Sequence, residues 1–238
     1  MQTAFATGAD RGLGFALTAG LVAGGWRIVA GQFLPEWHEL GALRERYPEQ
    51  VQIVPLDVGS DASVVVAAVL AATFTDRIDL PIGNAGVGSP ASNQAIREPQ
   101  DYAEMHRLYD VNALGGLRIV GALLPLLDTG TMKRLCFVSS EAGSVARATR
   151  TAMYGYCLSG AALNMATRIL FNDLQPQGYT FRVYHTGWLR TYMRGEKSTR
   201  SQLEPEEAAV PARAYFLPDR DDEDRLALRD WQGEEWPW

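Results

Sequence analysis

"TAFATGADRGLG", residues 3–14, is the stretch that decides the fold of this 238-residue chain. Residues 3–7 are short and apolar, as in a buried strand, and the glycine-rich run 7–14 leads into an apolar helix that ends near Gly24. Glycines let the backbone turn sharply and approach a ligand closely, and a helix N-terminus attracts negative charge. The stretch therefore predicts a strand, a phosphate-binding loop and a helix. A tight turn without a ligand is the alternative.

The rest of the chain repeats this alternation of short apolar runs and longer helical patterns. Strands are predicted over 3–7, 26–31, 51–56, 78–86, 134–140, 179–187 and 225–231. Helices are predicted over 36–47, 61–74, 99–124 and 154–174 and within 204–217, with Asp61 as the cap of the second. The alternation predicts a single doubly wound Rossmann-type α/β domain over residues 1–238, a mainly parallel sheet of six to seven strands with helices on both faces. In such a sheet a ligand binds outside the carboxyl ends of the strands.

Charge and cysteine content exclude several classes of partner. The net charge of −6 and the pI of about 5.1 argue against nucleic acid and against an anionic membrane surface. Two cysteines without a C-x-x-C pattern or a Cys/His cluster argue against a metal site. No run approaches the roughly 18 apolar residues of a membrane span, and the first residues lack the features of a signal peptide. We therefore expect a cytoplasmic protein whose partner is a small-molecule substrate.

Further motifs lie at the ends of the predicted strands, in an order that resembles the short-chain dehydrogenase/reductase family. The matching segments are "TGADRGLG" (7–14), "LDV" (56–58), "NAG" (84–86), "VNALGG" (111–116), "VSSEAGS" (138–144), "YCLSGAALNM" (156–165) and "HTGWLRTYM" (185–193). The last of these and the terminal "DWQGEEWPW" resemble the carbonyl-reductase-like and C-factor-like branch. The resemblance covers almost the whole chain.

This resemblance implies an oxidoreductase that transfers a hydride between NAD(P)(H) and a small carbonyl or alcohol substrate. It implies that the Tyr156 hydroxyl donates a proton, that Ser140 orients the substrate oxygen and that Asn112 supports a proton-relaying water. It implies no metal. The residues that it implies for cofactor binding are Gly8, Arg11, Gly12, Leu13, Gly14, Asp57, Val58, Asn84, Ala85, Gly86, Gly187 and Thr191.

The chain departs from the family pattern at Gly160, where family members carry a lysine whose charge lowers the pKa of the tyrosine. The surrounding "SGAALNM" (159–165) matches the family's "SKAALNM", so the departure is not a shift of register. Glycine has neither a charge nor a donor, and neither of the chain's two lysines is close to it in sequence. A loop arginine, Arg150 or Arg190, is the hypothesis for the source of the missing charge.

Other departures surround the expected cofactor. They are Gly83 in place of asparagine, Pro81 inside the fourth strand, Thr186 in place of proline, and Gln32 and Phe33 after the second strand. The last two provide neither the Asp that selects NAD nor the Arg that selects NADP. Only Arg11 favours a 2′-phosphate by its charge, so NADP(H) is expected rather than NAD(H). A solvated Arg11 and a protein that binds no nucleotide are the alternatives.

Three functions are open on this scaffold. The retained residues favour an oxidoreductase with an atypical set of Asn112, Ser140 and Tyr156 and no lysine. The second is a catalytically lapsed NAD(P)-binding or regulatory relative. The third is a non-redox lyase, isomerase or cyclase that polarises a substrate oxygen. Each of the three residues also has a plain structural alternative, since Tyr156 can pack, Ser140 can cap a turn and Asn112 can bond helix backbone.

Three segments outside the motifs carry further expectations. Residues 188–204 are expected to form a substrate lid, and the acidic run 219–224 to be a solvated loop. The C-terminal tryptophans are expected to pack on the domain, near the substrate or at a subunit contact. The resemblance implies a homo-oligomer, a dimer or tetramer, although the carbonyl-reductase-like branch includes monomers. Four basic residues of this segment recur every three or four positions, a spacing that would place them on one side of a helix: Arg190, Arg194, Lys197 and Arg200. The expected role of such a row of charges is a solvated surface, and the alternative is a basic lid that favours an anionic substrate.

Overall fold

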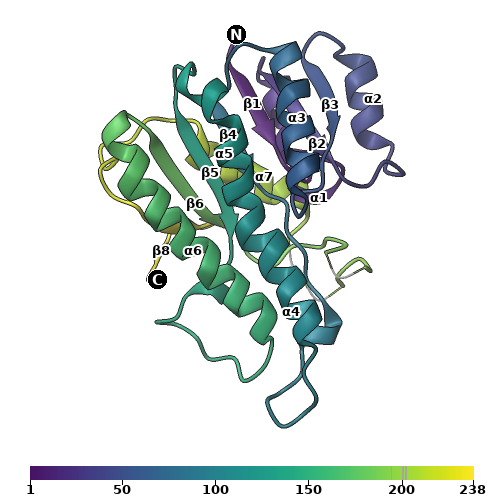
Figure 1. Cartoon of the computed structure of the whole chain (residues 1–238), viewed down its shortest axis with the longest axis vertical. Helices are drawn as coiled ribbons and strands as arrows, with labels where there is room; N and C mark the ends of the chain where they lie inside the picture. Colours follow the sequence, from purple (N-terminus) through teal and green to yellow (C-terminus); the bar gives the residue numbers. More distant parts are fainter. Residues whose placement is uncertain (194, 200, 202) are drawn as a thin grey trace.

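The first strand and its Gly-rich loop lie inside an eight-stranded sheet of order β3-β2-β1-β4-β5-β6-β7-β8 (Figure 1). The computed structural model describes residues 1–193, 195–199, 201 and 203–238. The strands are β1 (Thr3–Ala6), β2 (Arg27–Gln32), β3 (Val51–Pro55), β4 (Leu80–Gly83), β5 (Arg134–Ser139), β6 (Thr180–His185), β7 (Leu228–Asp230) and β8 (Glu235–Trp236). All neighbours pair in parallel except β8, which is antiparallel to β7. The strand order reverses between β1 and β4, the switch point at which doubly wound sheets bind ligands.

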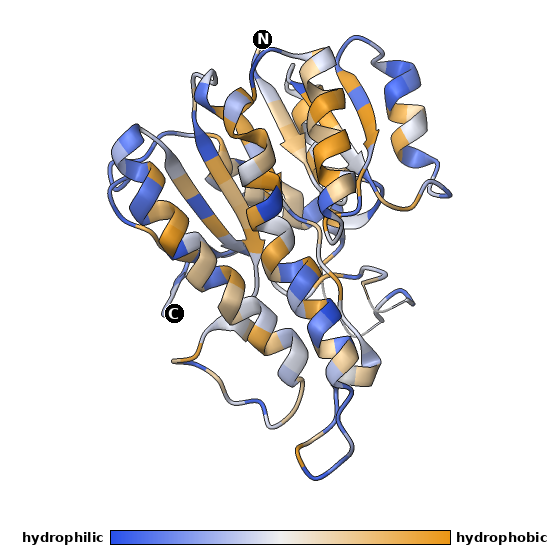
Figure 2. Ribbon diagram, viewed as in Figure 1, coloured by the Kyte–Doolittle hydropathy of each residue, from blue (hydrophilic) through white to orange (hydrophobic). Residues whose placement is uncertain are grey.

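Helices cover both faces of this sheet. They are α1 (Gly12–Ala23), α2 (Glu39–Arg46), α3 (Asp61–Phe74), α4 (Tyr102–Tyr109), α5 (Gly115–Asp128), α6 (Tyr154–Leu174) and α7 (Pro205–Phe216), with 3-10 turns η1 (Pro90–Ser92), η3 (Glu141–Gly143) and η4 (Gln175–Gln177). Figure 2 shows that α3 is mostly hydrophobic, whereas α2 is mostly hydrophilic. Two cores result, because α3, α5 and α6 pack on one face and α1, α2 and α7 on the other. The predicted doubly wound α/β fold is confirmed, with eight strands rather than six or seven because the last residues add β8 as a short hairpin.

Asn112 lies where one long helix changes its winding. The π-helical segment η2 (Asp110–Leu114) joins α4 to α5, so residues 102–128 form one continuous helix where 99–124 was predicted. Single π-helical turns are rare and are often found at functional sites. By length and composition this helix is able to cross a membrane, but within the domain it packs against α3 and α6. It is a helix of the folded domain.

Two local features of the strands and helices follow from hydrogen bonding. Ser60, and not the predicted Asp61, caps α3, because its hydroxyl accepts a bond from the N–H of Ser63 at 3.3 Å. Pro81 lies inside β4 and pairs with β1, but pairing with β5 begins only at Ile82. Proline has no N–H to donate, so the sheet forgoes a ladder bond at this position.

The acidic run 219–224 is a loop with exposed Asp219, Asp221 and Asp224, as predicted, but its Glu223 is ion-paired with buried arginines. The side chains of Arg134 in β5 and Arg182 in β6 are each only 2% exposed. Both oxygens of Glu223 accept hydrogen bonds from Arg182 at 2.6 Å, and one lies 3.5 Å from Arg134. Arg134 also donates to the carbonyls of residues 216–218, the last residue of α7 and the two that follow it. The loop has a defined place because two buried cations require its carboxylates.

Candidate active site

The Gly-rich loop leaves the end of β1 and enters α1. Gly8 and Gly12 have φ values of +60° and +56°, in the left-handed region that favours glycine. A Cβ on Gly14 would lie 2.0 Å from the carbonyl oxygen of Gly8, so this position admits only glycine. Among the described residues no side chain caps the start of α1 at Arg11, and its first turn carries no acidic residue. The loop therefore presents a helix N-terminus that suits an anion.

The segment after β4 braces this loop. The hydroxyl of Thr7 accepts hydrogen bonds from the backbone N–H groups of Asn84 and Ala85 at 2.9 and 2.8 Å. The amide of Asn84 donates to the carbonyl oxygens of Thr7 and Gly8 at 3.0 and 3.2 Å. Asn84, which the resemblance assigns to the cofactor, thus holds the loop in shape through its side chain.

Three other residues predicted to bind the cofactor lie around the same edge of the sheet. The carboxylate of Asp57 accepts a bond from the N–H of Gly59 at 2.9 Å. Val58 is buried against α5, and Leu13 is buried in α1. The side chains of Val58 and Leu13 belong to the two hydrophobic cores, and Asp57 is the one polar residue of the three.

Arg11 is held by aromatic rings. Its guanidinium lies 5.0 Å from the centre of the Trp37 ring and 5.7 Å from that of Tyr192. It also donates to the carbonyl oxygen of Tyr192 at 3.3 Å. The alternative of a solvated loop arginine was wrong, because Arg11 joins the Gly-rich loop to the segment after β6. Trp37 and Tyr192 were missed by sequence reasoning, which carries no signal for rings brought together from distant segments.

A chain of hydrogen bonds links Asn112 to Tyr156. The amide of Asn112 donates to the hydroxyl of Ser159 at 3.0 Å, and Ser159 donates to the carbonyl oxygen of Tyr156 at 2.9 Å. Asn112 also bonds the N–H and the carbonyl of Val87 at 2.8 and 2.9 Å. The π-helical turn, the segment after β4 and the start of α6 are thereby held together. Ser159 was missed by sequence reasoning, although its place beside Gly160 in the matching segment was a signal.

Ser140 and Gly160 meet through a tight turn. The hydroxyl of Ser140 caps η3 by accepting a bond from the N–H of Ala142 at 3.1 Å. A Cβ on Gly160 would lie 3.2 Å from the Cα and the N of Gly143, and a Cβ on Gly143 would lie 2.6 Å from the carbonyl carbon of Gly160. The two glycines therefore allow the turn after Ser140 to contact the helix that carries Tyr156. The absence of a side chain at Gly160 therefore allows α6 and the turn after Ser140 to pack closely.

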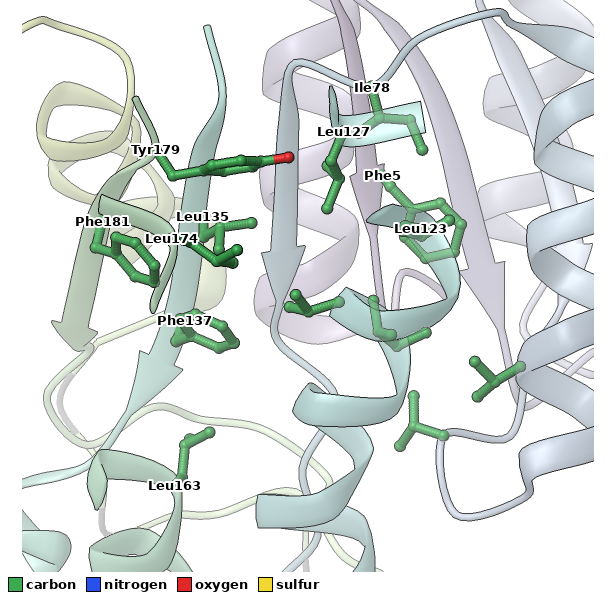
Figure 3. Close-up of a cluster of buried hydrophobic side chains, with 14 of the residues drawn as sticks. Phe5, Ile78, Leu123, Leu127, Leu135, Phe137, Leu163, Leu174, Tyr179 and Phe181 are labelled. Carbon is green, nitrogen blue, oxygen red and sulfur yellow. The ribbon is translucent and has the colours of Figure 1, made fainter. Parts of the chain in front are cut away.

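Gly83, at the end of β4, packs against Phe137 of β5. The two residues are paired in register, and a Cβ on Gly83 would lie 3.1 Å from the Phe137 ring. Phe137 belongs to the core that also contains Leu163 of α6 (Figure 3). A cavity of about 10 Å³, room for about one water, adjoins them and is bordered by Asn112. The small residue in β4 is thus matched by a large one in β5.

The segment after β6 folds back on the Gly-rich loop. A Cβ on Gly12 would lie 3.4 Å from the Cγ2 of Thr191. The carbonyl of Met193 accepts a hydrogen bond from the N–H of Gly88 at 3.2 Å, and the Met193 side chain lies near Gly86. Thr191 and Gly86, both predicted to bind the cofactor, are therefore close to the entrance of α1 and to Asn112 respectively.

Arg190 and Lys197, the two basic residues of this segment that the structure describes, do not lie on a helix. The described residues of 188–204 contain no helix, and Leu189 instead forms an isolated bridge with Leu203. Arg190 and Lys197 each pair with Glu204 at 3.2 Å. Arg194 and Arg200 lie outside the described residues. The predicted helical face was wrong for the described residues, which form turns, bends and one isolated bridge.

The C-terminal tail reaches the same edge of the sheet. Gly187, with φ of +72°, lies under Trp231: a Cβ there would be 2.7 Å from the indole. The hydroxyl of Ser144, just after η3, donates to the carbonyl of Pro237 at 2.5 Å. Trp231, Trp236 and Trp238 all pack against the hydrophobic cores. The expectation that these tryptophans pack on the domain is confirmed, and they do so near the candidate site.

Glu141 and Arg150 form an ion pair beside Ser140 that sequence reasoning did not foresee. Glu141 also accepts a bond from the Trp188 indole at 3.4 Å. Burial raises the pKa of the Glu141 carboxyl, but the bonds from Arg150 outweigh it and hold the pKa below its ordinary value of 4.5. Glu141 is therefore a carboxylate, placed directly after the serine.

Comparisons with known proteins agree with this fold. A family model described as short chain dehydrogenase matches residues 2–202. The chain is 37% identical over 164 residues to C-signal of Myxococcus xanthus, which covers 69% of this chain and 95% of that protein. The structure of NADPH-bound carbonyl reductase from chicken fatty liver matches 100% of this chain and 99% of its own, with a TM-score of 0.86 and 26% identity. A carbonyl reductase from Pseudomonas aeruginosa PAO1 in complex with NADP matches 100% of both chains, with a TM-score of 0.81 and 26% identity.

Proposed function

We propose that this chain, which belongs to the short-chain dehydrogenase family, is an oxidoreductase that interconverts a small carbonyl compound and its alcohol with a nicotinamide cofactor. The observation that carries the proposal is the hydrogen-bond chain from Asn112 through Ser159 to Tyr156. It fixes the start of α6, through the backbone of Tyr156, against the π-helical turn and the segment after β4, and the close approach of Gly143 and Gly160 holds the turn after Ser140 against the same helix. A proton donor needs such fixed placement beside the oxygen that it serves.

The loop after β1 fits a dinucleotide by its glycine conformations and by the uncapped start of α1. We propose NADP(H) rather than NAD(H). Arg11 brings a positive charge to the loop, and Gln32 and Phe33 stand where NAD-binding proteins place a carboxylate for the ribose. The two carbonyl reductases named above are bound to NADPH or NADP, which supports the same choice. When bound, the nicotinamide ring supplies the hydride chemistry.

The roles of the protein residues follow from their places. In the reductive direction the hydroxyl of Tyr156 gives its proton to the carbonyl oxygen while the carbonyl carbon gains a hydride, so that an alcohol forms. The hydroxyl of Ser140 orients that oxygen. Gly160 stands at the position of the family's lysine, so Tyr156 lacks that cation. Losing one aid to acid–base catalysis typically costs about 10²- to 10⁴-fold in rate, and we expect slow turnover.

Residues 188–204 are proposed to act as a lid over the substrate. Thr191 lies against Gly12, and Met193 is bonded to the segment after β4, so the described part of this segment spans both sides of the proposed cofactor site. A cytoplasmic location and a small-molecule substrate remain predictions.

A second candidate, a catalytically lapsed NAD(P)-binding or regulatory protein, is favoured by one observation. A Cβ added to Gly160 would lie only 3.2 Å from the backbone of Gly143. The packing therefore leaves little room for a side chain at the position from which the family's cation extends.

Titration of the protein with NADPH, NADH and their oxidised forms, followed by assays on a broad carbonyl panel, tests the proposal. Binding of NADPH with alcohol formation and equal cofactor oxidation is the expected result. Failure of all four nucleotides to bind would overturn the proposal. Nucleotide binding without turnover on any carbonyl would favour the lapsed protein instead.

A further inference from the structure

We propose that Arg150 is a positioning residue that provides the positive charge beside Tyr156. The proposal rests on the proposed function, because a cation matters there when Tyr156 exchanges a proton with a substrate oxygen. Gly160 has no charge of its own and faces the backbone of Gly143. The cation therefore has to come from outside α6. The sequence suggested two loop arginines, Arg150 and Arg190, and the structure distinguishes between them by their ion pairs.

Arg150 is fixed by a two-pronged ion pair. Its Nη1 donates to Oε2 of Glu141 at 2.7 Å, and its Nη2 donates to Oε1 of the same carboxylate. The two side chains are 27% and 14% exposed, so the pair is largely shielded from water. Glu141 directly follows Ser140 and begins η3. The guanidinium therefore has a set position relative to the proposed catalytic serine.

The same guanidinium lies within electrostatic reach of the first turn of α6. The bonds to Glu141 are the largest cause that raises the pKa of Arg150, burial opposes them, and Cys157 and Tyr156 raise it further. A tyrosinate at 156 and the guanidinium therefore attract each other, and the attraction favours the ionised tyrosine. The contact between Gly143 and Gly160 keeps η3, and with it Glu141, against this helix.

The loop that carries Arg150 is anchored at the C-terminal tail. The Ser144 hydroxyl donates to the carbonyl of Pro237 at 2.5 Å, and the N–H of Ala146 donates to the carbonyl of Trp238 at 3.1 Å. The guanidinium of Arg147 lies 4.4 Å from the centre of the Trp236 ring. These contacts limit the motion of the loop and so help to keep the charge of Arg150 in place.

The other candidate cations in the described part of the chain are committed elsewhere. Arg190 and Lys197 both pair with Glu204. Lys133 directly precedes β5, at the amino end of that strand, and lies 5.3 Å from the centre of the Tyr179 ring. Arg11 lies near the rings of Trp37 and Tyr192. Of the two arginines that the sequence suggested, Arg150 is the one held next to Ser140, through Glu141, on the turn that contacts α6.

The test compares Arg150→Gln, Arg150→Lys and Glu141→Gln with Arg107→Gln. Arg107 makes a matched two-pronged pair with Glu104, but on the exposed side of α4. The ionisation of Tyr156 is measured in each protein as the tyrosinate absorbance that disappears when Tyr156→Phe is added. The pH profile of kcat and the Kd for NADPH are measured in parallel.

Arg150→Gln is expected to move the Tyr156 titration about one pH unit higher and to lower kcat at neutral pH about tenfold, with an unchanged Kd. Arg150→Lys should restore most of both, and Arg107→Gln should match the natural chain. Glu141→Gln should move the titration in the opposite direction, because it leaves the guanidinium without its carboxylate. A Tyr156 titration that stays in place in both Arg150→Gln and Glu141→Gln would overturn the proposal. Because this readout needs neither nucleotide nor turnover, a protein that binds no nucleotide refutes the proposed function and still tests Arg150.

Discussion

Restoring a lysine at position 160 is the most direct perturbation of the proposed site. The position lies four residues after Tyr156, one turn along α6, and its Cα faces η3. A Cβ there would lie 3.2 Å from the Cα and N of Gly143 and 3.9 Å from the carbonyl carbon of Ala142. The contact is tight but not closed, so η3 has to move by only a few tenths of an ångström to admit a side chain.

The expected change in stability is small because two terms oppose each other. Replacing a glycine inside a helix gains up to about 1 kcal/mol from backbone entropy. Extra atoms in a packed contact typically cost about 1–3 kcal/mol. We therefore expect Gly160→Ala to lower the free energy of unfolding by about 0–2 kcal/mol. Both Gly160→Ala and Gly160→Lys should remain folded and should bind NADPH as the natural chain does.

The expected change in activity is large and specific to the charge. Gly160→Lys should raise kcat on a reducible carbonyl by about 10²-fold, the lower end of the range for acid–base assistance, because Arg150 already provides part of the charge. Gly160→Ala should give no gain. In the Arg150→Gln background the gain from Gly160→Lys should be larger, and a double-mutant cycle measures this coupling.

The assay is steady-state NADPH oxidation with product quantification, accompanied by urea denaturation and NADPH titration of each variant. A folded, NADPH-binding Gly160→Lys protein whose kcat equals that of Gly160→Ala would refute the reasoning. It would show that the chemistry at Tyr156 is not limited by the missing cation.

Four further predictions follow from the same structure. Glu223→Ala should lower the free energy of unfolding, measured in urea, by about 3–5 kcal/mol, because it leaves the buried Arg182 without its carboxylate. As a control, Ala in place of the exposed Glu49 should change this free energy by less than about 0.5 kcal/mol. The pKa of Glu141 is lowered on folding, so its pair with Arg150 contributes stability that is present above the ordinary value of 4.5 and is lost as the pH falls through the folded value. The stability difference between the natural chain and Arg150→Gln should therefore be constant near neutral pH and shrink in acid, and a constant difference across the acid range would contradict the pairing. Gly14→Ala should abolish NADPH binding and destabilise the fold, because the added Cβ would lie 2.0 Å from the Gly8 carbonyl oxygen. The control is Gly41→Ala in α2, whose added Cβ would meet nothing within 4 Å, and it should leave the stability unchanged or raise it by up to about 1 kcal/mol. A homo-oligomer stays a prediction: Leu158 and Met165 of α6 are each 61% exposed, and replacing both with Asp should lower the mass in light scattering if α6 forms the subunit contact.

The sequence by itself determined the fold and the set of candidate residues. The strand, glycine loop and helix at residues 3–23 depend on local patterns, namely an apolar run, glycines at defined spacing and a helical period. The same holds for α3 and α6, whose bounds 61–74 and 154–174 agree with the prediction. The order of short motifs then marked Asn112, Ser140 and Tyr156 as the candidate residues.

Only the tertiary structure decided which neighbours these residues have. Gly83 is matched by Phe137, 54 positions later in the chain, and the acidic run is held by arginines from β5 and β6. The choice between Arg150 and Arg190 likewise depends on where Glu141 and Glu204 lie. Such pairings join residues that are far apart in the sequence or that lie in irregular loops. No periodic sequence pattern predicts which of these side chains contact one another. Local chemistry therefore specifies the elements, and the charge beside Tyr156 is decided by how the loop after β5 packs on α6.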